Sequence, residues 1–163
     1  MKTALLSVFL ITLLLISGCG SFEDNYQADA DLTRIADFNY YVEALKKYHE
    51  ETGSYPLMKE YATTPVYSII IEGETPEWVL QSGADVLYIE DDELLKELQK
   101  TLGDDFELHY DPQNYAETSR PVFYIYSLSS IGAGITVHLY EEIPGSVKVD
   151  EHYYKLEEFL PFN

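Results

Sequence analysis

The chain has 163 residues, 46% of them hydrophobic and 24% charged, and its 29 acidic and 10 basic side chains give a formal net charge of −19. This length fits one ordinary domain, and the chain is too apolar to be disordered. The charge argues against a nucleic-acid-binding protein and against a protein held on anionic lipid by charge alone, since both need clustered Lys and Arg.

The first eighteen residues have the organisation of a secretory signal peptide. Lys2 supplies a positive start, an uncharged Leu-rich stretch covers residues 4–16, and Ser17 and Gly18 precede Cys19. The apolar stretch is shorter than the roughly 20 residues that a membrane-spanning helix needs. The alternatives are a plain signal peptide followed by an incidental Cys, and an uncleaved anchor helix.

The run Ile16-Ser17-Gly18-Cys19 resembles the bacterial lipobox. The resemblance implies that residues 1–18 are removed by cleavage between Gly18 and Cys19, and that the acylated thiol of Cys19 holds the mature chain on a lipid bilayer. Because Cys19 is the only Cys, an intramolecular disulfide is excluded. Gly20 comes next, and by resemblance to the sorting rule of bacteria with two membranes it implies the outer membrane, facing the periplasm, in such a host.

The polar, acidic stretch that follows Cys19 shows no apolar periodicity, so residues 19–30 are predicted to be the lipidated Cys and a flexible tether. Residues 31–163 are then expected to form a single domain. Its first element is a helix predicted over residues 31–52, because one apolar stripe recurs at three- and four-residue steps and Gly53 and Pro56 follow. The stripe consists of Leu32, Ile35, Phe38, Val42, Leu45 and Tyr48 or His49.

Two strands and a second helix are predicted next. β-branched residues over 66–71 predict a buried strand, and residues 86–89 predict a shorter one. Leu residues at helical spacing predict a helix from Asp91 or Asp92 to Leu102. The acidic run at its start complements the helix dipole, and this interpretation is favoured over a cation site.

The C-terminal third is predicted to be a meander of strands. Residues 106–110 alternate in polarity, and residues 122–129, apolar on both faces, predict a central strand. A strand over 134–141 is predicted to pair with 146–150 through a Pro-Gly turn, whereas the mixed pattern of 152–162 fits neither a helix nor a strand and leaves that segment unassigned. The expected fold is α+β: a long N-terminal amphipathic helix packed on a mostly antiparallel sheet, with a second short helix.

Two stretches resemble the major pseudopilin of type II secretion. The first, similar to that family's helix end, is Ala44-Leu45-x-x-Tyr48-x-x-x-x-Gly53-x-Tyr55-Pro56. The second, similar to its Asp-Pro loop and Tyr-Ser strand, is Tyr110-Asp111-Pro112-Gln113-Asn114 with Phe123-Tyr124-Ile125-Tyr126-Ser127-Leu128. The resemblance implies a pilin-like globular domain. The family's Gly-Phe-Thr-Leu-x-Glu processing site and the carboxylates of its calcium loop are absent, so neither filament assembly by the usual helix nor a calcium site is implied.

No sequence motif indicates an enzyme. The patterns H-E-x-x-H, G-x-S-x-G, G-x-x-x-x-G-K-[S/T] and G-x-G-x-x-G are absent, and His49, His109, His138 and His152 share no ligand spacing. No catalytic residue, metal ligand or cofactor is therefore predicted. The alternative hypothesis is a small envelope hydrolase or ligand-binding lipoprotein whose site follows no recognised pattern.

The 15 Tyr residues are the remaining signal. Most are expected within the sheet and at its half-buried edges, but Tyr is also enriched in binding hot spots. The candidate partner-binding residues are Tyr124, Tyr126, Tyr153 and Tyr154. The expected function is that of an envelope lipoprotein that binds a protein or surface polymer, in connection with a secretion or pilus-like system. The negative charge predicts a protein partner whose contact surface is not acidic.

Overall fold

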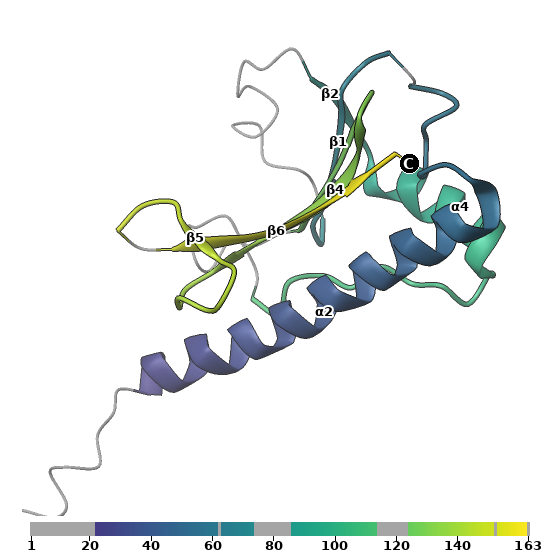
Figure 1. The fold of residues 1–163 in the computed structure, drawn as a ribbon. Helices are drawn as coiled ribbons and strands as arrows, with labels where there is room; N and C mark the ends of the chain where they lie inside the picture. Colours follow the sequence, from purple (N-terminus) through teal and green to yellow (C-terminus); the bar gives the residue numbers. More distant parts are fainter. Residues whose placement is uncertain (1–21, 62, 74–85, 114–123, 152, 163) are drawn as a thin grey trace, which may run out of the picture.

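The computed structural model describes residues 22–61, 63–73, 86–113, 124–151 and 153–162. Within these residues two helices and six strands follow one another in the order α2, β1, β2, α4, β3, β4, β5 and β6 (Figure 1). The strands form one mostly antiparallel sheet. The predicted α+β class, with a long N-terminal helix packed on the sheet, is confirmed.

Helix α2 spans Phe22–Thr52. It therefore includes residues 22–30, and the prediction that these residues belong to a flexible tether is wrong. Extending a helix that is already nucleated by packing costs little, so its first turns need no apolar stripe of their own. At the other end, Gly53 adopts a φ of +69° and donates its N–H to the carbonyl of His49 at 2.8 Å, which ends the helix as predicted.

The buried face of α2 departs from the predicted stripe at its start. The predicted positions that are buried are Phe38, Val42, Leu45 and Tyr48. Leu32, in contrast, is 67% exposed. The first buried residues of the helix are instead Ala30 and two charged residues that the apolar pattern passed over, Asp31 and Arg34. Leu32 lies on the solvent side because the helix turns this polar pair, not the first Leu, toward the rest of the fold.

Helix α4 spans Asp91–Leu102, as predicted. Its first turn carries Asp91, Asp92 and Glu93, while Glu90 precedes it without a side-chain capping bond. These carboxylates therefore complement the helix dipole by charge. Its buried residues are Leu94 and Leu98.

The sheet has the strand order β2-β1-β3-β4-β6-β5. The strands are β1 (Val66–Ile70), β2 (Leu87–Ile89), β3 (Tyr124–Ser129), β4 (Gly132–Leu139), β5 (Val147–Lys148) and β6 (Tyr154–Pro161). Among the described strands, β1 and β2 pair in parallel and the other pairs are antiparallel. Strand β3 lies between β1 and β4, so the prediction of a central strand there is confirmed, with residues 122 and 123 outside the described part of the chain.

The predicted strand over 134–141 is confirmed as β4, shifted by two residues, but its predicted pairing partner and the predicted strand over 106–110 are wrong. Residues 147 and 148 pair with β6 and not with β4. Strand β6 itself comes from the segment with no predicted element, and it pairs with β4 along all of β4. Residues 106–110 form no strand. Two of their carbonyls bond instead to side chains of α2, since the hydroxyls of Tyr40 and Tyr41 donate to Glu107 and His109 at 2.9 and 2.6 Å.

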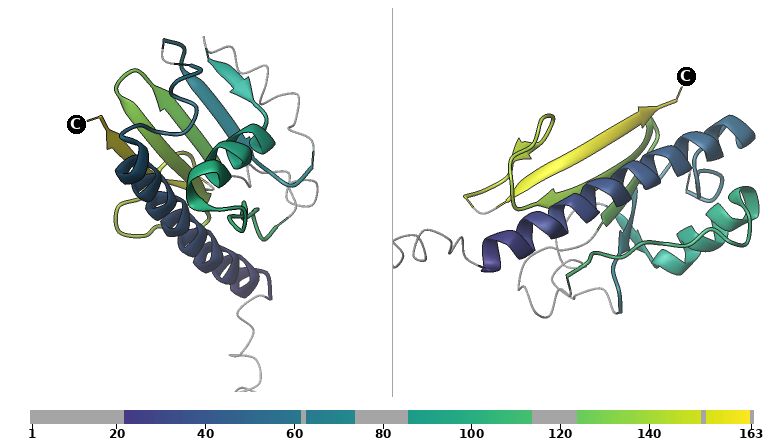
Figure 2. Two further views of the ribbon diagram at one scale, coloured as in Figure 1. Left: turned by 90° about the vertical axis from the view of Figure 1, so that its right-hand side faces the viewer. Right: turned by 90° about the horizontal axis from the view of Figure 1, so that it is seen from below.

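Both helices lie on the same face of the sheet, as the views in Figures 1 and 2 show. Leu45 of α2, Leu98 of α4 and Ile135 of β4 belong to one buried cluster between the layers. The first turns of α2 project beyond the sheet in Figure 1. The opposite face of the sheet carries a smaller cluster that contains Ile69 and Ile71.

Candidate functional site

The predicted site residues fall in different places. Gly18 and Cys19, the predicted cleavage and lipid-attachment residues, lie outside the described residues. Tyr124 and Tyr126 are 0% and 1% exposed, so the prediction that they contact a partner is wrong. They point from β3 into the core, where their hydroxyls donate to the carboxylate of Asp37 and the carbonyl of Pro56, both at 2.7 Å.

Tyr153, just before β6, and Tyr154, the first residue of β6, are half-buried, and their contacts place them on opposite faces of the sheet. Tyr154 packs against the core, and the ammonium of Lys148 lies 6.0 Å from its ring centre. Tyr153 lies on the other face, where its ring meets His138 edge-on at 5.0 Å. Of the four predicted Tyr residues, Tyr153 is the one placed on the face of the sheet that the helices leave open.

Two exposed Val residues lie next to the Tyr153 segment at the sheet edge, where Val149 donates its N–H to the carbonyl of Tyr153 at 3.1 Å and Val147 pairs with Lys155. Val147, which is 62% exposed, and Val149, which is 46% exposed, belong to the short outermost strand and the residues after it. Burial lowers the pKa of His138 to about 4, so this ring is uncharged at neutral pH. We call Val147, Val149, Tyr153 and His138 the edge patch.

Charged residues surround the edge patch. The exposed acidic residues of this region are Glu141, Glu142, Asp150 and Glu151. The basic side chains beside them are Lys148 and Lys155, and Lys155 pairs with Glu157 at 2.5 Å. The surrounding charge is therefore predominantly negative, which favours a basic partner over an acidic one.

A buried ion network supports the chain next to the edge patch. Arg34 donates to Asp31 at 2.8 Å and to Asp111 at 2.7 and 2.8 Å, and also to the side-chain carbonyl of Gln113. Burial alone would lower the pKa of Arg34, but its hydrogen bonds to Asp111 and Asp31 raise it, so the guanidinium stays charged. The second oxygen of Asp31 accepts the N–H groups of Tyr140 and Glu141, both at 2.8 Å.

Asp37 and His109 form the pair that most resembles catalytic machinery. The Nδ1 atom of His109 lies 2.6 Å from a carboxylate oxygen of Asp37, as in a carboxylate that orients a general base. However, the ring of Tyr40 stacks on the imidazole at 4.2 Å. Tyr41 bonds both the N–H and the carbonyl of His109. These contacts all join α2 to the segment of residues 105–111, so the pair is best explained as a clamp between the two.

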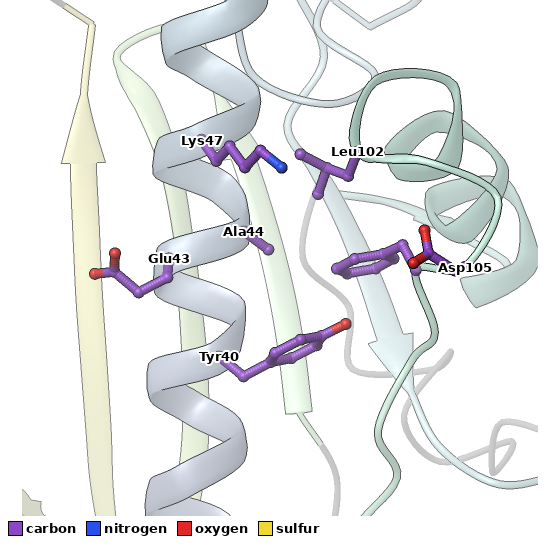
Figure 3. A pocket seen from close by; sticks show the side chains of 7 residues that line it. Tyr40, Glu43, Ala44, Lys47, Leu102 and Asp105 are labelled. Carbon is purple, nitrogen blue, oxygen red and sulfur yellow. The ribbon is translucent and has the colours of Figure 1, made fainter.

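A groove lies between α2 and the end of α4, with a volume of about 350 Å³ (Figure 3). Tyr40, Ala44 and Phe106 supply its apolar surface together with Leu102. The charged residues that line it are Glu43, Lys47 and Asp105. This site was not predicted, because residues 40–47 and 102–106 meet only in the folded chain and neither segment carries a recognisable motif.

Two further properties of the described residues bear on function. In the parts of the chain that the structure describes, no cluster of three or more His, Cys, Asp or Glu side chains is arranged to hold a metal ion. Neither described helix combines the length and apolar character that crossing a bilayer requires. Comparison with known proteins found no matching family model, no matching curated protein and no matching solved structure.

Proposed function

We propose that this chain is a lipid-anchored protein of the bacterial cell envelope, and that its domain binds a protein partner through the edge patch. The observation that carries the binding proposal is the exposure of Val147 and Val149 beside Tyr153 at the sheet edge. An apolar centre with a polar rim is the usual arrangement of a protein interface. Because the charged residues around it are mostly acidic, the partner's contact surface is expected to be basic or neutral.

The lipobox-like run supports an anchor at Cys19. Only Gly20 and Ser21 separate this Cys from Phe22, the first residue of α2. A helix of 31 residues is about 46 Å long, so α2 provides a stiff connection where the sequence predicted a flexible one. An anchored domain would therefore have a restricted orientation at the membrane surface. In this arrangement, a partner protein in the same envelope has access to the edge patch.

The pilin-like part of the proposal has two supports. A long N-terminal helix on a mostly antiparallel sheet is the arrangement that the pseudopilin resemblance implies. The resembling stretches contribute residues to the buried core, among them Tyr48, Tyr55 and Tyr126. Since the assembly site of that family is absent, we propose a binding module related to a secretion or pilus-like system and not a filament subunit.

The anchor is tested by Cys19→Ser. This variant lacks the thiol that accepts the lipid, so we expect an unprocessed precursor or a soluble product, and loss from the membrane fraction. Mass spectrometry of the mature wild-type protein should show an acylated Cys19. Ser21→Ala, a change of similar size two residues further on, should be processed and acylated like the wild type. An unmodified Cys19 in the mature protein would contradict the lipoprotein proposal.

The edge patch is tested by the double variant Val147→Ser/Val149→Ser. Removing two exposed apolar side chains should weaken partner capture by tenfold or more, on the order of the loss at an interface hot spot, with little change in stability. The measurement is cross-linking and pull-down from solubilised envelopes, followed by binding kinetics with the captured protein. Ile131→Ser is the matched control, because Ile131 is 68% exposed but lies in the turn between β3 and β4, at the far end of β4.

The binding kinetics also test the charge argument. Association with a basic partner should slow as salt concentration rises, since screening removes the long-range attraction. If Ile131→Ser reduced capture as much as the double variant, the edge patch would not be the interface. Turnover of an envelope ester or polymer that was lost on substitution of His109 would favour the hydrolase alternative.

A further inference from the structure

The groove between α2 and α4 is held in shape by hydrogen bonds that leave its opening free. Gly103 ends α4 with a φ of +114°, and Phe106 donates its N–H to the carbonyl of Gly103 at 3.1 Å. The side chain of Gln99 donates to the carbonyl of Phe106 at 2.9 Å. On the other wall, the hydroxyl of Tyr40 is fixed on the carbonyl of Glu107. A groove whose walls are already ordered loses little entropy when a ligand binds.

The walls of the groove are aromatic. The rings of Tyr40 and Phe106 are nearly parallel, at an angle of 10° and a centre-to-centre distance of 5.3 Å. His109 covers one face of Tyr40, and Phe106 is 8% exposed, so a ligand meets mainly the edges of these rings. Aromatic edges carry partial positive charge and pack well against the face of another ring. The apolar surface of the groove therefore suits a flat ring.

The charges of the groove lie at separate places on its rim. Lys46 pairs with Glu43 at 3.2 Å, and Figure 3 shows Glu43 pointing away from the groove. Lys47 extends across the opening toward Leu102 in the same view. In the described part of the chain, Lys47 has no ion-pair partner. Asp105 supplies a carboxylate on the α4 side.

We propose that this groove binds a free aromatic amino acid. The ring would pack among Tyr40, Phe106 and Leu102, the carboxylate would bind the ammonium of Lys47, and the amino group would bind Asp105. The volume of about 350 Å³ is within the range of small-molecule sites. The protein's net charge of −19 repels anions at range, whereas a zwitterion carries no net charge and matches both rim groups.

The proposal is tested with L-phenylalanine and two analogues, each lacking one charged group. The protein as processed in its host is purified and titrated while the amide signals of Ala44, Lys47 and Asp105 are followed by NMR. L-phenylalanine should bind saturably below about 10 mM and shift these signals. Phenethylamine, without the carboxylate, and phenylpropionate, without the amine, should each bind about fivefold more weakly. L-alanine, without the ring, should not bind.

Matched variants test which residue on the rim binds the carboxylate of the ligand and which binds its amino group. Lys47→Met should remove the difference between L-phenylalanine and phenethylamine, and Asp105→Asn should remove the difference between L-phenylalanine and phenylpropionate. Lys46→Met and Asp104→Asn, one residue away in each case, should leave both differences intact. The proposal is overturned if L-phenylalanine does not saturate, if its shifts lie outside the groove, or if the neighbouring variants act like the groove variants. Because the edge patch is a separate site, none of these outcomes bears on partner binding.

Discussion

Arg34→Met should be among the most destabilising substitutions in this protein, with a loss of about 3 to 5 kcal/mol in the free energy of unfolding. Arg34 is completely buried, and its partners Asp31 and Asp111 are almost completely buried as well. Met has a similar length but no charge, so it leaves two carboxylates in the interior without their cation. The measurement is urea denaturation followed by circular dichroism.

The control for this prediction is Lys96→Met, the same kind of change at an exposed ion pair. Lys96 contacts Asp92, and these side chains are 68% and 60% exposed. A pair of this kind contributes at most about 1 kcal/mol. Equal losses for the two variants would show that the Arg34 network is solvated in solution and does not hold the fold together.

The Arg34 network also connects stability to the edge patch. Asp31 accepts two backbone N–H groups from residues 140 and 141, where β4 ends and the chain turns toward β5. The guanidinium of Arg34 itself lies 4.9 Å from the ring centre of Tyr140. Loss of Arg34 should therefore loosen this turn before the rest of the sheet, which amide hydrogen exchange at residues 140–149 would report.

The elements that could be predicted from the sequence are those with a local signal. Helix α4 has Leu residues at helical spacing, and β1 is a β-branched run, so both were located to within a residue. The first turns of α2 have no such signal, since Phe22 to Ala30 lack apolar periodicity. Their helical state follows from continuation of a helix that packs further on, which local sequence does not encode.

Strand pairing in the C-terminal third was not predictable for a different reason. The Pro144-Gly145 turn suggested a local hairpin between its flanking segments. In the structure, β6 takes the place beside β4 and leaves β5 on the outside. The choice between these partners depends on which strand buries more apolar surface. Leu160 of β6 joins the core, whereas Val147 of β5 stays exposed.

Which Tyr residues are exposed could not be predicted from the sequence either. An aromatic strand predicts that Tyr residues alternate between two faces, but not which face the helices cover. Tyr124 and Tyr126 fell on the covered face, while Tyr153, in a segment with no predicted element, lies in the edge patch. Val147 and Val149 carry no binding signal in the sequence, because their exposure results from the short outermost strand.

Leu45→Ala should cost about 2 to 5 kcal/mol, because it removes a buried side chain and leaves a cavity. Leu45 is 3% exposed and belongs to the cluster that joins α2 to the sheet and to α4.

Thr52→Ala is the control on the same helix. Thr52 is exposed, and its hydroxyl bonds the carbonyl of Tyr48 at 2.9 Å near the helix end, so its loss should cost about 1 kcal/mol or less. Chemical denaturation of both variants, with the wild type alongside, gives the comparison. The two free energies should differ by more than the error of the extrapolation, and α2 would not be docked on the sheet if they were the same.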